Sequence, residues 1–254
     1  MTPGTARRLA DNLYAARREA RFAYLAGFDL PQSVADAYAV QSELILLAGD
    51  NRGWKVTALA AEDQRKFASD RPVAGPLFDP YFHAAPATLR HATYLTPLLE
   101  CEVAFLLKSD LPTRAEPYRR GDIEAAIAAV VPVFEIVDAR VPPEAANLTK
   151  LADCIGNGDF IMGTPVKDWH GLDLRNIAIA LSLDGAVAEH GNSARILGDP
   201  LLALLALANA QPVSGELKAG QIVTTGSCIT PLAAARGHYV GLFGPLGQVS
   251  VDFI

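Results

Sequence analysis

PLLECEVAFLL, residues 97–107, is an apolar segment that carries two acidic residues, Glu100 and Glu102, one position apart. Its Leu, Val and Phe residues favour a β-strand over a helix. Side chains alternate between the two faces of a strand, so both acids share one face, about 7 Å apart at the backbone, with Cys101 and Val103 on the other. Burying ionised carboxylates without compensation costs several kcal/mol each. We therefore expect that this face is open to water, that one acid holds a proton, or that a cation lies between them.

VVPVFEIVDARV, residues 130–141, is a second apolar strand that is interrupted by an acid, Glu135. Asp138 falls on the opposite face, and Arg140 is a candidate partner for it. If the two strands are neighbours, Glu135 converges with the two acids of the first strand. Three carboxylates suit a hard divalent cation such as Mg²⁺ or Mn²⁺. From spacing alone the alternative stays open that the glutamates lie on a wet face or pair with Arg and Lys.

Composition and charge narrow the classes of protein. The chain has 254 residues, 50% of them hydrophobic and 20% charged, which is typical of a globular protein with a substantial core. With a net charge of −6, the chain has no excess of positive charge that would favour binding to nucleic acid or to an anionic membrane. Three widely spaced cysteines without a CxxC motif indicate reduced, buried thiols. With no apolar signal core in the first 21 residues, we expect a cytoplasmic protein that does not enter a membrane.

Periodicity predicts an α+β chain. Residues 5–28 and 33–49 have helical patterns, and the second begins with Ser33 as N-cap and stops at Gly49. From Gly53 onward strands and turns dominate, including a hairpin that turns at Asp184-Gly185. We expect a helical portion over residues 1–52, packed on a β-rich mixed-sheet body over residues 53–254, as one structural unit.

Two helices are expected to interrupt the strands of the body. One covers residues 121–131 and the other residues 198–210. In the second helix Asp199 is the predicted cap, and Pro200 occupies the first helical position.

Four segments in order, LLECEVAF, FEIVDAR, GNGDFIMG and LKAGQIVTTGS, resemble the hydratase/decarboxylase branch of the fumarylacetoacetate hydrolase superfamily. Members include 2-hydroxypenta-2,4-dienoate (2-keto-4-pentenoate) hydratase and 4-oxalocrotonate decarboxylase. The similarity runs from AYAVQ at residue 37 to the end of the chain. It implies the fold of that superfamily, and it implies that Glu100, Glu102 and Glu135 are the ligands of a divalent metal, Mg²⁺ or Mn²⁺.

The resemblance also suggests catalytic and substrate-binding residues. GWKV resembles the family's active-site lysine segment, so Lys55 corresponds to that lysine. DRPVAGPLFD resembles a second family segment, which makes Asp70 and Asp79 candidates, with Asp79 preferred for proton transfer. TTGSCITP resembles a glycine-serine turn near the substrate carboxylate. The substrate-binding candidates are Asp70, Asp153, Gly226, Ser227 and Thr230.

This chain departs from the family pattern in two places. TALA, residues 57–60, replaces the usual G-L-T-S, and DCIGNG, residues 153–158, replaces the usual D-N-A-S-S-G. TALA and the CIG part of the second replacement, residues 154–156, are largely apolar, which favours a substrate with a neutral tail, because a buried unpaired charge is costly. The lost Ser and Asn also favour a non-catalytic 2-oxo-acid-binding protein as an alternative class.

We expect a lyase that adds water to a 2-hydroxy-2,4-dienoate or 2-oxo-enoate, with decarboxylation of a 2-oxo-3-enedioate as the alternative. The resemblance further implies a small-molecule 2-oxo or 2-hydroxy-dienoic acid as ligand and a homo-oligomer. It is also compatible with a complex with a pathway partner enzyme of the same family. The five histidines show no metal-ligand spacing and are assigned to surface or structure.

Overall fold

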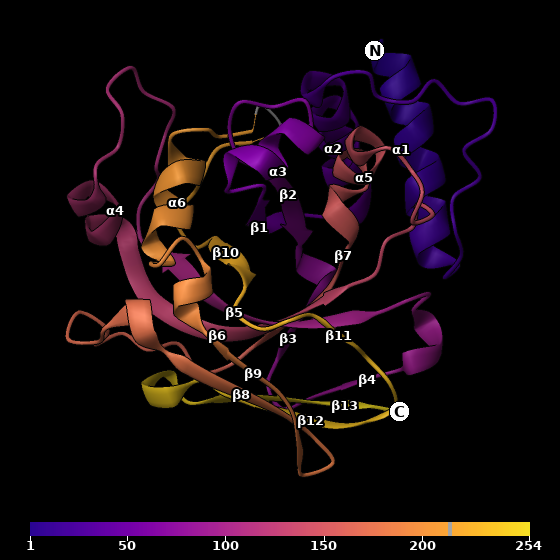
Figure 1. Ribbon diagram of the computed structural model, residues 1–254. Coiled ribbons are helices and arrows are strands. Elements are labelled where there is room, and N and C mark those ends of the chain that lie inside the picture. The colour runs from indigo at the N-terminus through magenta and orange to yellow at the C-terminus, as the bar shows by residue number, and fades with distance from the viewer. Residues whose placement is uncertain (213–214) are drawn as a thin grey trace.

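The computed structural model describes residues 1–212 and 215–254 as two β-sheets with helices at the rim of the larger one (Figure 1). The helices are α1 (Pro3–Arg18), α2 (Val34–Ala48), α3 (Ala61–Lys66), α4 (Arg120–Ala126), α5 (Asn147–Ala152) and α6 (Leu201–Ala208). Figure 1 shows α1, α2 and α5 gathered on one side and α4 and α6 on the other. The predicted α+β class is confirmed.

The larger sheet has the strand order β2-β1-β10-β5-β6-β7-β3, and β11 adds to β5. Its strands are β1 (Asn51–Thr57), β2 (Val73–Phe78), β3 (Phe82–Ala84), β5 (Leu98–Leu107), β6 (Ile127–Val137), β7 (Asn157–Met162), β10 (Ile222–Ser227) and β11 (Leu232–Ala233). It is mixed, because β1 runs parallel to β10 and β3 to β7, while β5 and β6 are antiparallel. The mixed sheet expected for the body is therefore present.

The smaller sheet has the order β4-β13-β12-β8-β9. Its strands are β4 (Ala87–Leu89), β8 (Ala178–Leu183), β9 (Ala186–Asn192), β12 (Gly237–Leu242) and β13 (Gln248–Phe253). The hairpin predicted at Asp184-Gly185 joins β8 to β9, and both turn residues have positive φ, 51° and 82°. Tight two-residue hairpins require this backbone conformation.

The main hydrophobic core lies between the two sheets. Phe134 of β6 packs against Phe243, and β13 contacts β6 and β7. On β5, Cys101, Val103 and Phe105 point into this core and are fully buried. The opposite face of β5 and β6, which carries Ala104, Val131 and Val133, therefore points away from the smaller sheet.

A second core joins the helices to the body. α1 packs on α2, and α2 packs on α5 and β2. Val73 and Phe78 of β2 are buried in the same cluster as Leu9 and Leu13 of α1. The division at residue 52 stays a prediction. No helix in the described part of the chain is long and apolar enough to cross a membrane.

Three predicted helix boundaries differ from the structure. The first helix ends at Arg18, because the backbone at Ala20 turns into the left-handed region with φ 47°. The helix predicted over residues 121–131 ends at Ala126, since the following Ile- and Val-rich residues join β6. The last helix begins at Leu201, whose N–H donates to Asp199 Oδ1 at 3.0 Å, so Pro200 precedes the helix.

Candidate metal centre and substrate pocket

The two acidic strands are direct neighbours in the larger sheet. β5 and β6 pair antiparallel, with Glu100 opposite Glu135 and Glu102 opposite Val133. Because residues i and i+2 share a face, all three acids point to the same side, away from the main core. The condition for the three acids to converge is therefore met, and the predicted shared face of Glu100 and Glu102 is confirmed.

The three carboxylates form one compact cluster. Each of Glu100, Glu102 and Glu135 offers an oxygen that lies within 4.8 Å of the others. Glu102 and Glu135 are each 1% exposed, and Glu100 is half-buried. Glu135 Oε2 is buried without a hydrogen-bond partner among the described residues, which leaves an acceptor unsatisfied.

Lys55 of β1 is the cation that faces this cluster. Its Nζ forms a buried ion pair with Glu135 Oε1 and donates to the carbonyl of Ile155 at 3.2 Å. Burial acts to lower the pKa of Lys55, but Glu135, Glu100 and Glu102 outweigh it and raise this pKa. The ammonium form is therefore favoured beside the acids.

The carboxylates themselves are difficult to ionise without a further cation. Burial, followed by Glu135 and Glu100, raises the pKa of Glu102 well above its usual value. Burial also raises the pKa of Glu100. When all are ionised, three carboxylates and one ammonium have a formal charge of −2 in a mostly buried space. Oxygen ligands with this charge and one unsatisfied acceptor fit a divalent ion such as Mg²⁺ or Mn²⁺.

A strained turn supplies the carbonyl that contacts Lys55. Cys154, Ile155 and Gly156 all have positive φ, 53°, 56° and 68°, although the first two have side chains that disfavour this region. The preceding Asp153 holds the turn, because its carboxylate accepts from Arg140 Nε at 3.0 Å and from the Arg140 backbone at 2.7 Å.

This ion pair corrects one expectation from the sequence. The Arg140 side chain pairs with Asp153, whereas the Asp138 carboxylate accepts from the backbone N–H groups of Leu95 and Thr96. The contact between Arg140 and Asp138 is made to the backbone carbonyl of Asp138, and its carboxylate takes no part in it. The carboxylate of Asp153 is fully engaged within the protein, so we expect it to act on substrate binding by holding the turn.

The glycine-serine turn lies next to the cluster. Gly226 donates its N–H to Glu102 Oε2 at 3.0 Å, and its φ of 106° suits glycine. Ser227 lies opposite Glu102 in the pairing of β10 with β5, and its Oγ is buried without a hydrogen-bond partner among the described residues. Thr230 is exposed, beyond the end of β10.

Asp79 and Asp70 lie away from the cluster. Lys55 pairs with Gly75 on β2, so Asp79 lies four residues further along, about 13 Å at strand spacing. Asp79 is half exposed and pairs with Arg52 at 2.6 Å. Asp70 is exposed and pairs with its neighbour Arg71. The proposed roles of both aspartates stay predictions.

Comparisons with known proteins place these features in a family. The chain is 32% identical to a 2-hydroxyhexa-2,4-dienoate hydratase of Comamonas testosteroni over 252 residues, which cover 95% of this chain and 94% of the relative. It is 29% identical to a 2-oxo-hept-4-ene-1,7-dioate hydratase of Escherichia coli, with 97% of both chains covered. The chain belongs to the hydratase/decarboxylase branch of the fumarylacetoacetate hydrolase superfamily. No family model matches it.

Other comparisons agree with this family and its fold. A 4-oxalocrotonate decarboxylase of Pseudomonas putida is 28% identical over 97% of this chain and 96% of the relative. The solved structure of 4-oxalocrotonate decarboxylase from Pseudomonas putida G7 with magnesium and adipate superposes with a TM-score of 0.87 at 24% identity, covering 100% of this chain and 99% of that one. The predicted superfamily and its fold are confirmed.

In this family member a pocket of about 230 Å³ adjoins the carboxylate cluster. Gly226, which contacts Glu102, is part of its wall, together with Thr225. The TALA segment forms another wall, so its apolar residues do face a cavity beside the site. The lining residues are Val56, Thr57, Ala58, Leu59, Ala60, Asp63, Arg195, Ile196, Leu197, Thr225 and Gly226.

Sequence reasoning missed two participants in this arrangement. The carbonyl of Ile155 belongs to a left-handed turn that no motif reveals, although the unusual CIGNG segment marks its place. Arg195 lines the pocket from the loop after β9. The sequence gives no sign of it, because its approach depends on how the two sheets meet.

Proposed function

We propose that this chain is a divalent-metal-dependent lyase that adds water to a 2-hydroxy-2,4-dienoate or 2-oxo-enoate. The observation that carries the proposal is the cluster of Glu100, Glu102 and Glu135 within 4.8 Å of one another, with Lys55 against it and a pocket beside it. Hydratases among the relatives named above support this choice of reaction.

Glu100, Glu102 and Glu135 would hold Mg²⁺ or Mn²⁺ through one oxygen each. When bound, such an ion supplies Lewis acidity that stabilises negative charge on a 2-oxo acid. The Gly226 N–H, which donates to Glu102, fixes the orientation of that carboxylate. The unsatisfied Oε2 of Glu135 remains available as a ligand atom.

Lys55 is the proposed proton carrier. Its Nζ lies beside the cluster, is held by Glu135 and the Ile155 carbonyl, and is 7% exposed. The buried ammonium can donate a proton to the substrate, and the neutral amine that remains can then take one back. Ser227, whose hydroxyl has no hydrogen-bond partner among the described residues, is the proposed hydrogen-bond donor to a substrate oxygen.

Decarboxylation is the second candidate, favoured by the relatedness to 4-oxalocrotonate decarboxylase over nearly the whole chain. The same cluster suits it, because loss of CO₂ from a vinylogous β-keto acid also generates a dienolate. A non-catalytic 2-oxo-acid-binding protein is the third. It would keep the ligand site without turnover.

One assay separates the three functions. 2-Hydroxypenta-2,4-dienoate and 2-oxohex-3-enedioate are offered with Mg²⁺ or Mn²⁺, while dienol absorbance and released CO₂ are recorded together. Loss of dienol without CO₂ supports the hydratase, and stoichiometric CO₂ supports the decarboxylase. Binding without either change supports the binding protein. Glu135→Gln, which removes a ligand charge at constant size, should lose turnover, and the exposed Glu144→Gln should keep it.

A further inference from the structure

Arg195 presents an uncompensated positive charge to the pocket beside the carboxylate cluster. It is exposed and belongs to the 3₁₀ turn Ser193–Arg195 that follows β9. Within residues 1–212 and 215–254 no hydrogen bond or ion pair engages its guanidinium. Its neighbours Ile196 and Leu197 line the same pocket.

A chain of backbone contacts ties this turn to the metal-ligand strand. The N–H of Asn192 donates to the carbonyl of Cys228 at 3.0 Å, and the N–H of Cys228 donates to the carbonyl of Cys101 at 2.8 Å, between Glu100 and Glu102. The approach requires glycine at position 191, because a Cβ there would lie 2.0 Å from the Cys228 oxygen. The loop is thus docked closely against the site.

The side chains of the turn also fix its conformation. Ser193 is fully buried, accepts from the N–H of Ile177 at 2.8 Å and donates to the Leu174 carbonyl at 2.7 Å. The side chain of Asn192 accepts from the N–H of Ala194 at 2.8 Å. The side chain of Arg195 therefore extends from a backbone that is held by hydrogen bonds. Little loop entropy is lost when its guanidinium binds a ligand.

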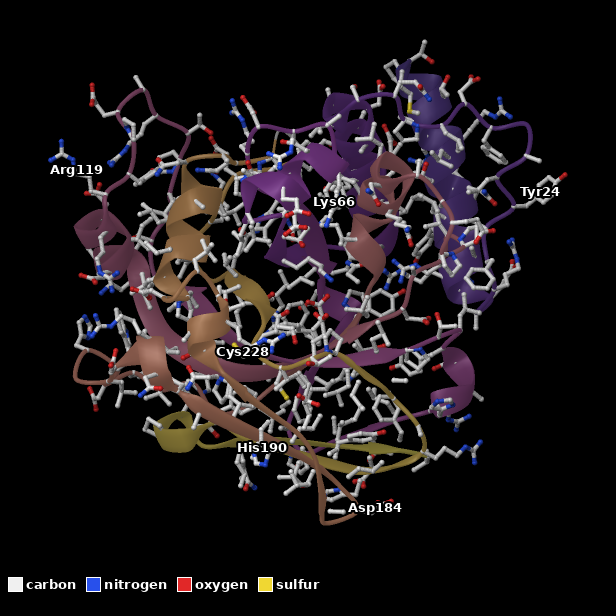
Figure 2. All side chains as sticks on the ribbon, viewed as in Figure 1. Tyr24, Lys66, Arg119, Asp184, His190 and Cys228 are labelled. Atoms are coloured by element: carbon white, nitrogen blue, oxygen red, sulfur yellow. The ribbon has the colours of Figure 1, made fainter. Side chains whose placement is uncertain are left out.

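The turn that carries Arg195 and the strand that carries Glu100 and Glu102 share a neighbour, Cys228, which lies near the centre of the molecule in Figure 2. The next contact is Gly226, whose N–H donates to Glu102 Oε2. Ile196 also lies beside Gly226, since a Cβ on that glycine would be 3.2 Å from Ile196 Cδ1. The guanidinium and the cluster thus belong to one continuous site.

Asp63, the other charged residue that lines the pocket, is already paired with a lysine. It belongs to α3, and its carboxylate accepts from Lys66 Nζ at 2.7 Å. The other walls are apolar or carry threonine hydroxyls. An acid group on a ligand would meet one free cation here and no unpaired anion among the described lining residues.

We propose that Arg195 is a specificity-determining residue that binds the distal carboxylate of a 2-oxo diacid whose 2-oxo acid end lies at the carboxylate cluster. This rests on the proposed function for the position of the 2-oxo acid end. It reverses the preference for a neutral tail that the TALA segment alone suggests. The guanidinium can take a carboxylate in a bidentate arrangement, which distinguishes it from a methyl end of the same length.

The test compares diacids with monoacids of equal chain length. Binding of 2-oxoglutarate, 2-oxoadipate and 2-oxopimelate is measured by calorimetry with Mg²⁺, each against its 2-oxo monoacid. In wild type we expect at least one diacid to bind about 10- to 100-fold more tightly than its monoacid, the usual size of a charge-assisted hydrogen bond. Arg195→Gln should abolish this preference without weakening the monoacid. Arg195→Lys should retain part of it.

Two controls sharpen the test. Arg175→Gln removes an equal charge from an exposed position that pairs with Asp173, and it should keep the diacid preference. Turnover of unsaturated analogues is recorded in parallel. A diacid preference that depends on Arg195 but comes without turnover would support this inference and refute the proposed lyase. Turnover with no diacid preference, or with one that Arg195→Gln leaves intact, would overturn the inference alone, and failure of every acid to bind would overturn both.

Discussion

Glu102→Gln is expected to stabilise the metal-free protein while removing its response to divalent ions. Glu102 is 1% exposed and lies within 4.8 Å of two other carboxylates. Two unit charges 4.8 Å apart repel by about 3.5 kcal/mol at an effective dielectric constant of about 20. Part of this cost is relieved by protonation, because the pKa of Glu102 is raised. We therefore expect the metal-free variant to melt about 2–5 °C above the metal-free wild type.

Added metal should raise the melting temperature of wild type much more than that of Glu102→Gln. An ion at 100 times its Kd stabilises a folded protein by about 2.7 kcal/mol, which corresponds to about 5–11 °C for a chain of this size. Wild type should show this rise with Mg²⁺ or Mn²⁺ in thermal melts after treatment with a chelator. For Glu102→Gln, the metal-induced rise in melting temperature should be less than about 2 °C.

The pH dependence of these melts provides a further check. A carboxyl group with a raised pKa binds more protons in the folded state, so the metal-free wild type should lose stability as the pH rises from the usual value of 4.5 through the raised pKa of Glu102. The metal-induced rise should grow over the same range, because the ion displaces those protons. Glu144→Gln, on an exposed carboxyl, is the matched control. Equal metal responses in Glu102→Gln and wild type would refute the three-carboxylate site, as would no response together with no bound ion by elemental analysis.

Three further predictions concern the same region. Lys55→Met should keep the metal-induced rise in melting temperature yet lower kcat by roughly two to four decades, and a loss of less than threefold would reduce Lys55 to a structural residue. Asp79→Asn should lower kcat by a similar factor if Asp79 transfers protons and Asp70→Asn should not, whereas equal, near-wild-type rates would remove Asp79 from the mechanism. The pKa values of Cys154 and Cys228 are raised to about 12 by burial, so only about one thiol in 10⁴ is ionised at pH 8. A thiol reagent at that pH should label the native protein far more slowly than the denatured chain, and rapid native labelling would contradict their burial.

The parts of the fold that depend on local patterning could be predicted from the sequence. The alternation in residues 97–107 gives the faces of β5, because side-chain direction in a strand follows directly from position. Ser33 and Gly49 bound α2, since capping is a local interaction, and the Ser33 side chain does accept from the N–H of Asp36. Neither inference needs knowledge of distant residues.

The parts that depend on distant contacts could not be predicted in this way. Arg140 sits two residues from Asp138, yet it pairs with Asp153, because the chain bends after β6 and brings the turn that follows α5 beside it. Arg195 reaches the pocket only because Gly191 lets β9 approach the end of β10. The carbonyl of Ile155 acts through the backbone, which the residue type does not reveal.

The direct pairing of Glu100 with Glu135 also bears on how faithfully the chain folds. β5 and β6 are otherwise apolar over ten and eleven residues, so many alignments of the two strands would bury similar surface. A slip of β5 by one position would turn Glu100 and Glu102 into the space between the two sheets, where the described core residues are hydrophobic and offer no cation. Misaligned pairs of β5 and β6 are therefore less stable than the native pair. The three acids therefore help to specify the register of β5 against β6. A divalent ion would stabilise only the register that brings all three carboxylates together.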